Sequence, residues 1–332
     1  MRRFALAFIA ICLAAGAAPV RAADWPTKPI HFIVPFPPGS FADITIRIMQ
    51  QKLGPRLGQT IVVDNRSGAS GDIGSEALAR AKPDGYTFGI ATNSTHGTSP
   101  ALNPRLPYNA VNDFAMVSMI GDAPYVLITA PNLPVKSVQD LIALAKSKPG
   151  EISYASVGPA SLAHLAGALF SQMADVKLNE VPYRSSAQSV LDTASGRIDI
   201  QFGTMAPVLP HVLSGKVKAL AVTSLKRAAV LPDVPTLDES GLKGFEASLW
   251  LAVIAPGKTP PEMVERMNRE VRAVLADPEV VEALRRQGIE ATPSSPDELR
   301  ARMAGDIAKW KKLAQETGIS MDTEATGSIP SK

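Results

Sequence analysis

The sequence predicts an α/β protein of two lobes, each a mainly parallel sheet flanked by helices. Three observations lead to this fold class. Short β-rich runs alternate with amphipathic helical segments, as they do in α/β proteins. The elements fall into two groups, before and after about Tyr125. The chain has 332 residues, enough for two domains of about 100–200 residues each.

The first 22 residues are expected to be a secretory signal peptide that is cleaved on export. Arg2 and Arg3 precede an apolar run that ends near Ala18 and is too short for a comfortable membrane span. A Val-Arg-Ala tripeptide at 20–22 matches the small-x-small pattern of a cleavage site. An uncleaved anchor is the alternative, which the short run disfavours. The sequence therefore predicts an exported protein.

Removal of the signal peptide would change the net charge and the cysteine content of the chain. The signal holds three of the 34 basic side chains and no acids, so 31 basic side chains remain against 31 acidic ones. A net charge near zero leaves no electrostatic footprint for nucleic acid. The single cysteine, Cys12, also lies in the signal, where the bulky Ile11 before it disfavours lipidation. The exported chain is thus expected to have no disulfide or thiolate metal site and to rely on core burial.

The first group of elements is expected to form the first lobe. Its strands are expected at 30–34, 60–64, 86–91 and 117–119. Apolar residues at helical spacing indicate a helix at 44–57. A glycine-rich turn at 65–74 leads into a second helix that reaches residue 81, and the Pro- and Asn-rich segment 103–113 is expected to be irregular.

The second group is expected to form the second lobe. Strands are expected at 125–129, 152–155, 180–182, 198–202 and 219–222. Helices are expected at 137–146, 161–173, 187–195 and 207–214. Ser137 is the expected N-cap of the first of these helices.

The last elements are expected to return to the first lobe. A strand at 249–255 is followed by helices at 261–276, 278–287 and 296–317. These helices bring no new set of strands, so they most easily complete the first lobe. The predicted organisation is a signal at 1–22, the first lobe at 23–124, the second lobe at 125–243, the return at 244–320 and a flexible tail at 321–332.

Motifs for catalysis and cofactors are weak. The four histidines lack the paired spacing of a zinc site, so neither a metal nor another cofactor is expected. The segment 68–74 lacks the Gly-Lys-Ser/Thr ending of a nucleotide-binding loop. Ser161 and His164 lie three residues apart at a helix start, but no Gly-x-Ser-x-Gly elbow surrounds the serine. A helix cap or a ligand hydrogen bond is favoured for Ser161, and a serine hydrolase is the least favoured alternative.

Loops rich in small and polar residues follow several predicted strands. They lie at 34–43, which reads VPFPPGSFAD, and at 92–98, 156–161 and 203–204. In open α/β sheets, ligands bind outside the carboxyl ends of the strands. Helix N-termini there present unpaired N–H groups and the positive end of the helix dipole, which suit a carboxylate. Because these loops hold no strong general base or nucleophile, they predict a cleft that binds a small anion without chemistry.

Motifs from Trp25 to about Gly318 are similar to those of one family. They include WPTKPI at 25–30, VPFPPG at 34–39, PDGYT at 83–87, HLAG at 164–167, VPY at 181–183, LPH at 209–211, ALAVT at 219–223 and LPDVPT at 231–236. In combination these motifs are specific. The chain resembles the tripartite tricarboxylate transporter receptors, which are periplasmic solute-binding proteins of the Bug or TctC family.

The resemblance implies a type II periplasmic-binding-protein fold, a Venus flytrap that closes on a small organic carboxylate. The implied ligand is a di- or tricarboxylate, an aromatic acid or a related compound. A large and a small membrane subunit of a transporter would receive it from a monomeric receptor that is not an enzyme. A sensory binding protein for a signalling partner is an alternative with the same fold.

The loops and the resemblance together give the candidate ligand-binding residues. In the first lobe they are Phe36, Pro38, Gly39, Ser40, Phe41, Ala42, Thr92, Asn93, Ser94 and Thr95. In the second lobe they are Ser156, Gly158, Ala160, Ser161, Tyr183 and Thr204. The Tyr183 phenol stands at a strand end, where it could line the cleft or pack beneath it. Asp43 lies in a first helical turn and is expected to have a structural role.

Departures from the family pattern concern specificity. After the prolines, the family has two glycines and a small hydroxyl residue, where this chain has Gly39, Ser40 and Phe41. A Phe41 ring at the cleft would narrow it or supply an apolar wall. Gly-Thr at 203–204 replaces an aspartate that the family often has there, which argues against an amino-acid ligand. The turn before Leu106 is also shorter than usual, and the identity of the ligand stays open.

Overall fold

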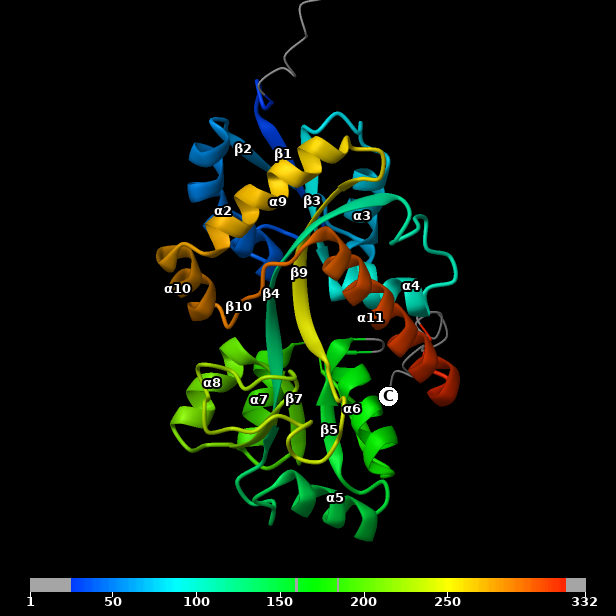
Figure 1. Ribbon diagram of the computed structural model, residues 1–332. Helices are drawn as coiled ribbons and strands as arrows, with labels where there is room; N and C mark the ends of the chain where they lie inside the picture. The colour runs from blue at the N-terminus through cyan, green and yellow to red at the C-terminus, as the bar shows by residue number, and fades with distance from the viewer. Residues whose placement is uncertain (1–24, 159–160, 184, 321–332) are drawn as a thin grey trace, which may run out of the picture.

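The computed structural model describes residues 25–158, 161–183 and 185–320. In this part of the chain, two α/β lobes lie end to end and are joined through two long strands (Figure 1). The strand order is β2-β1-β3-β9-β4-β7-β5-β6, and β8 and β10 both pair with β4. None of the helices in these ranges has the length and apolar content needed to span a bilayer. The predicted signal peptide, Ala160 and the predicted tail lie outside the described residues.

The first lobe is built on parallel strands in the order β2-β1-β3. Its elements are β1 (Ile30–Val34), α2 (Phe41–Leu57), β2 (Ile61–Asn65), η1 (Ala69–Gly71), α3 (Asp72–Ala79), β3 (Thr87–Thr92), η2 (Ser94–Thr98), α4 (Ser99–Leu102), α9 (Pro261–Leu275), α10 (Pro278–Arg286) and β10 (Glu290–Ala291). The apolar faces of α2 and α9 pack on the sheet, where Ile46 and Met267 join the core around Phe32 and Phe88. This burial holds the start of α2 beside the carboxyl end of β1.

The second lobe repeats this plan around β5, which pairs in parallel with β6 and β7. Its elements are α5 (Val138–Ser147), β5 (Ser153–Ser156), α6 (Leu162–Ala174), β6 (Asn179–Pro182), α7 (Ser186–Ala194), β7 (Ile200–Thr204), α8 (Met205–Leu213) and β8 (Lys218–Val222). Phe170, Phe202 and Phe245 are fully buried at its centre. As predicted, the Ser137 hydroxyl caps α5 by accepting from Asp140 N at 3.1 Å.

Strand β4 (Phe114–Thr129) runs unbroken through both lobes beside β9 (Ser248–Pro256). The prediction of two separate strands at 117–119 and 125–129 is therefore wrong. Bulges before Ser118 and Gly121 let the pairing with β9 continue between the two predicted segments. Gly121 is needed here because a Cβ on it would lie 2.5 Å from the carbonyl oxygen of Glu290.

Parallel pairing predominates only among the outer strands of the sheets. Strand β9 is antiparallel to β3 and β4, and β4 is also antiparallel to β7 and β8. The connecting strands run in opposite directions between the lobes, so they cannot be parallel neighbours. The predicted two-lobed α/β architecture is present, and its sheets are mixed at the centre.

Helix boundaries depart from expectation near two of the candidate loops. The helix expected at 44–57 begins three residues earlier, because the Ser40 hydroxyl caps it by accepting from Asp43 N at 3.3 Å. The loop expected at 92–98 contains the π-helical turn η2, which continues into α4. Both changes bring helical backbone closer to the strand ends than the sequence suggests.

Helix α11 (Pro296–Thr317) packs against both lobes. Leu299 and Met303, in its first half, belong to a first-lobe core cluster. Trp310 and Leu313, in its second half, belong to the core cluster of the second lobe. Figure 1 shows the helix passing beside β4 and β9 and reaching α6. The helix is therefore a third connection between the lobes.

Two glycines in helices, one closely packed and one exposed to open space, provide a test of how tightly the first lobe is packed around α3. A Cβ on buried Gly74 would lie 2.5 Å from Arg66 O and 2.6 Å from Pro35 Cα, whereas Gly305 in α11 has open space around it. Gly74→Ala should lower the free energy of unfolding by about 1–3 kcal/mol, because backbone must move. Gly305→Ala should raise it by about 0.5–1 kcal/mol, because alanine favours the helix. Urea unfolding measures both, and a Gly74→Ala protein as stable as the wild type would contradict the close packing.

Candidate functional site

A cavity of about 220 Å³ lies where the first lobe meets the connecting strand β9. Its lining residues are Phe36, Ser40, Phe41, Ala42, Thr92, Asn93, Ser94, Leu249 and Trp250. The first seven belong to the predicted loops after β1 and β3, which the fold brings together. Leu249 and Trp250 were not predicted, because they stand in an apolar run that is typical of a core strand.

The start of α2 forms one side of the cavity. Gly39 has a φ of 78°, which favours glycine, and it turns the chain into the cap at Ser40. The N–H groups of Phe41 and Ala42 are in the first helical turn and have no acceptor within the helix. The Ser40 hydroxyl accepts from Asp43 N and has no acceptor for its own proton among the described residues. These donors belong to residues that line the cavity.

Asp43 organises this loop from beneath. Its carboxylate accepts from Gly39 N (2.8 Å), from Arg47 Nε (2.9 and 3.0 Å) and from Asn65 Nδ2 (3.0 Å). The hydrogen bond from Arg47 lowers the pKa of the buried Asp43 carboxyl, against the opposing effect of burial. The same Asn65 amide donates to Phe36 O at 2.9 Å. Asp43 therefore fixes the loop and does not line the cavity, which agrees with the structural role expected for it.

The loop after β3 forms the adjacent side. Thr95 is fully buried, its Oγ1 lies 2.8 Å from His96 Nδ1, and its carbonyl accepts from the Tyr108 hydroxyl at 2.6 Å. Burial lowers the pKa of His96 to about 3, so the imidazole is neutral at neutral pH. Thr95 thus stabilises the loop from inside.

Asn93 differs from the other polar residues of this loop. Its side chain is only 3% exposed and borders the cavity. It has no hydrogen bond to any residue within the described ranges. The amide atoms are not fully buried, so they can hydrogen-bond to a ligand or to water in the cavity.

The second-lobe candidates do not line this cavity. Ser156 Oγ donates to Glu180 Oε1 at 2.5 Å, and the Tyr183 hydroxyl donates to Asp192 Oδ2 at 2.9 Å. Thr204 and Gly158 lie at the starts of α8 and of the turn before α6. Of the remaining first-lobe candidates, Pro38 and Gly39 shape the loop after β1 without lining the cavity.

The Ser161–His164 pair does not have the geometry of a hydrolase. The Ser161 hydroxyl donates to Gly158 O at 2.7 Å and accepts from the backbone N–H of His164 at 3.3 Å. The His164 Nε2 lies 3.5 Å from Glu180 Oε2. Ser161 is therefore the N-cap of α6.

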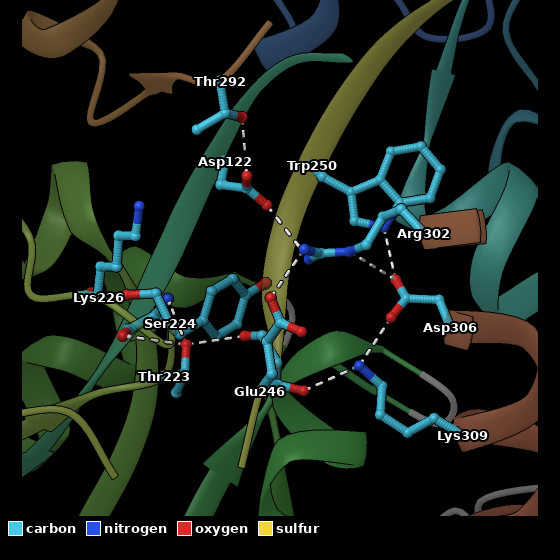
Figure 2. Close-up of polar contacts among 12 residues, drawn as sticks. Asp122, Thr223, Ser224, Lys226, Glu246, Trp250, Thr292, Arg302, Asp306 and Lys309 are labelled. Atoms are coloured by element: carbon cyan, nitrogen blue, oxygen red, sulfur yellow. Dashed lines mark hydrogen bonds and ion pairs between the residues drawn. The ribbon is translucent and has the colours of Figure 1, made fainter. Parts of the chain in front are cut away.

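Trp250 connects the cavity to a charged network beside β4 and β9 (Figure 2). The indole Nε1–H donates to Asp306 Oδ2 at 2.6 Å, and Lys309 Nζ donates to Asp306 Oδ1 at 2.7 Å. Arg302 lies between Asp122 (3.2 Å) and Glu246 (2.8 Å), as Figure 2 shows. The wall of the cavity is thus held by groups from α11, from β4 and from the segment just before β9.

The two-lobed fold with a small cavity beside its connecting strands defines a protein of the periplasmic-binding-protein type. The chain belongs to the family described as "Tripartite tricarboxylate transporter family receptor", which matches residues 45–319. This match confirms the predicted family. Protein BugT of Bordetella pertussis is 39% identical over 321 residues, which are 96% of this chain and 98% of BugT.

Solved structures agree with this assignment. Rpa4515 of R. palustris, solved with adipate, is 36% identical with a TM-score of 0.74, and the match covers 89% of this chain and 99% of that one. MatC (Rpa3494) from Rhodopseudomonas palustris, solved with bound malate, is 27% identical with a TM-score of 0.70, covering 87% and 99%. These likenesses confirm the predicted fold class.

The Asp43 contacts predict a pH-dependent stability. Asp43→Asn should lower the free energy of unfolding at pH 7 by about 1–3 kcal/mol, because it removes the ion pair with Arg47. Folding lowers the pKa of Asp43, so its contribution is complete above the ordinary carboxyl pKa and is lost as the pH falls through the folded-state pKa. The difference between wild type and variant should therefore shrink below about pH 4.

Urea unfolding at several pH values measures this difference. Asp233→Asn, at an exposed position, is the matched control and should have little effect. An Asp43→Asn protein with wild-type stability at pH 7 would contradict the role given to this carboxylate.

Proposed function

We propose that this chain is a periplasmic receptor that captures a small organic carboxylate and delivers it to the membrane subunits of a tripartite tricarboxylate transporter. Family membership supports the receptor role, and the neighbours solved with adipate and malate support a carboxylate ligand. The predicted signal peptide supports export. The use of Ser161 as a helix cap supports binding without catalysis.

The observation that carries the proposal is the Asn93 amide, which borders the cavity and has no hydrogen-bond partner among the described residues. The residues that line this cavity include no charged side chain. Together with the Ser40 hydroxyl and the N–H groups of Phe41 and Ala42, the Asn93 amide offers several neutral donors to one small ligand. A helix N-terminus adds its positive dipole end, which favours an anion. N–H and O–H groups that have no acceptor in the protein suit a carboxylate, because both of its oxygens accept hydrogen bonds and it donates none.

The second-lobe candidates are proposed to contact the ligand when the lobes close. Ser161 and Thr204 precede α6 and α8, so the first turns of these helices would bring further free N–H groups. Ser156 ends β5, Gly158 and Ala160 come after it in the sequence, and Tyr183 follows β6; ligands bind at such strand ends in α/β folds. In this proposal the first lobe binds the carboxylate and the second lobe contributes to selectivity.

A melting-temperature screen with mono-, di- and tricarboxylates, aromatic acids and amino acids tests the receptor role. A ligand present at 100 times its Kd should stabilise the protein by about 2.7 kcal/mol. If no compound in any of these classes raises the melting temperature, the proposal fails.

Asn93→Ala should weaken carboxylate binding about 10- to 100-fold, because a hydrogen bond to a charged ligand is lost. Titration calorimetry with a carboxylate found in the screen measures the change. Asn132→Ala, at an exposed asparagine of the second lobe, is the matched control and should bind as the wild type does. Equal affinities for wild type and Asn93→Ala would remove Asn93 from the site.

A further inference from the structure

We propose that the preferred ligand is a monocarboxylate with an apolar, ring-sized body, such as an aromatic or alicyclic acid. The inference rests on the proposed function, since it assigns the chemical class that the same cavity accepts. Three features of the described residues carry it: the neutral lining, the number of donors and the fixed apolar wall.

The lining contains no charged side chain. The cations on neighbouring elements are already paired with acids: Arg47 with Asp43, and Arg302 with Asp122 and Glu246. A second carboxylate placed in this cavity would leave water without gaining a cationic partner, which is costly. The cavity therefore has no place for a second carboxylate. In the second lobe, the Ser156 and Tyr183 hydroxyls already donate to the acids Glu180 and Asp192, so these two candidates offer neither a cation nor a free hydroxyl to a second carboxylate.

The donors suffice for one carboxylate. The Ser40 hydroxyl and the N–H groups of Phe41 and Ala42 come from one helix start, and the Asn93 amide comes from the neighbouring loop. Two carboxylate oxygens accept about four hydrogen bonds, so a single carboxylate uses this set fully.

The rest of the lining is an apolar wall. Phe36, Phe41 and Leu249 are partly exposed toward the cavity, and the fully buried Trp250 backs them. Because Asp306 holds the Trp250 indole at 2.6 Å, this backing has a fixed position (Figure 2). An apolar ring gains by burial against such a wall, whereas a hydroxylated or charged body loses hydration there.

Titration calorimetry of the exported protein with matched acids tests the inference. Benzoate and cyclohexanecarboxylate should bind at least about tenfold more tightly than acetate, which lacks the ring. They should also bind at least about tenfold more tightly than malate, adipate and terephthalate, which carry a second carboxylate. Benzamide, which has the ring without the charge, should bind at least about tenfold more weakly than benzoate.

Variants of Phe41 provide the second arm. Phe41→Ser should weaken benzoate binding about tenfold and reduce its advantage over malate, because part of the apolar wall is removed. Phe41→Leu keeps an apolar side chain and should retain most of the affinity. Leu213→Ser removes an exposed apolar side chain of α8 and should leave the affinities for benzoate and malate unchanged.

The outcomes separate this inference from the proposed function. If malate, adipate or terephthalate binds more tightly than both cyclic monocarboxylates, the inference is overturned and the carboxylate receptor stands. If no carboxylate of any class binds, both are overturned. An unchanged ratio of benzoate to malate affinity in Phe41→Ser would overturn the apolar wall as the source of selectivity.

Discussion

Strand β4 hydrogen-bonds to β9 along 114–124 and to β7 and β8 along 125–129, so one strand serves both sheets. Because its backbone groups are needed in both lobes, it cannot end between them. The pairing partners at the crossing point are Ala123 with Leu249 and Asp122 with Trp250. Leu249 and Trp250 also line the cavity, so the residues that join the lobes are the residues that form its wall.

The charged groups around this crossing tie the wall to the fold. Asp306 accepts from the Trp250 indole and from Lys309, and Lys309 also donates to Glu246 O at 3.0 Å. Arg302 links the carboxylates of Asp122 and Glu246. These groups are mostly buried, so losing one partner would leave another charge unpaired at considerable cost. The arrangement gives the cavity a rigid wall at the point where the two lobes join.

The sequence could predict features that depend on local chemistry. The Pro-Pro-Gly turn before Ser40 and the polar run from Thr92 identify loops whose backbone conformation is specified by their own residues, and both reach the cavity. Contacts between residues far apart in the chain could not be predicted in this way, because neither residue alone indicates its partner. Trp250 looks like an ordinary core residue until Asp306, 56 positions later, is placed beside it.

Contacts between distant segments also explain what could not be predicted about the strands and the second lobe. Gly121 and Pro124 are strand breakers by composition, and only the approach of β10 and β9 explains why the strand continues through them. The hydroxyls of Ser156 and Tyr183 donate to Glu180 and Asp192, and the composition of their loops did not indicate these partners. Local composition does not reveal which acceptor a hydroxyl will find.

Helix α11 has a mechanical consequence. Two adjacent strands alone would let the lobes both bend and twist about their common axis. A stiff helix that lies beside the strands and is anchored in both cores, through Met303 and Trp310, opposes the twist. In the closure proposed above, the lobes then have fewer relative orientations to lose, and a smaller entropy loss leaves more of the contact energy as affinity.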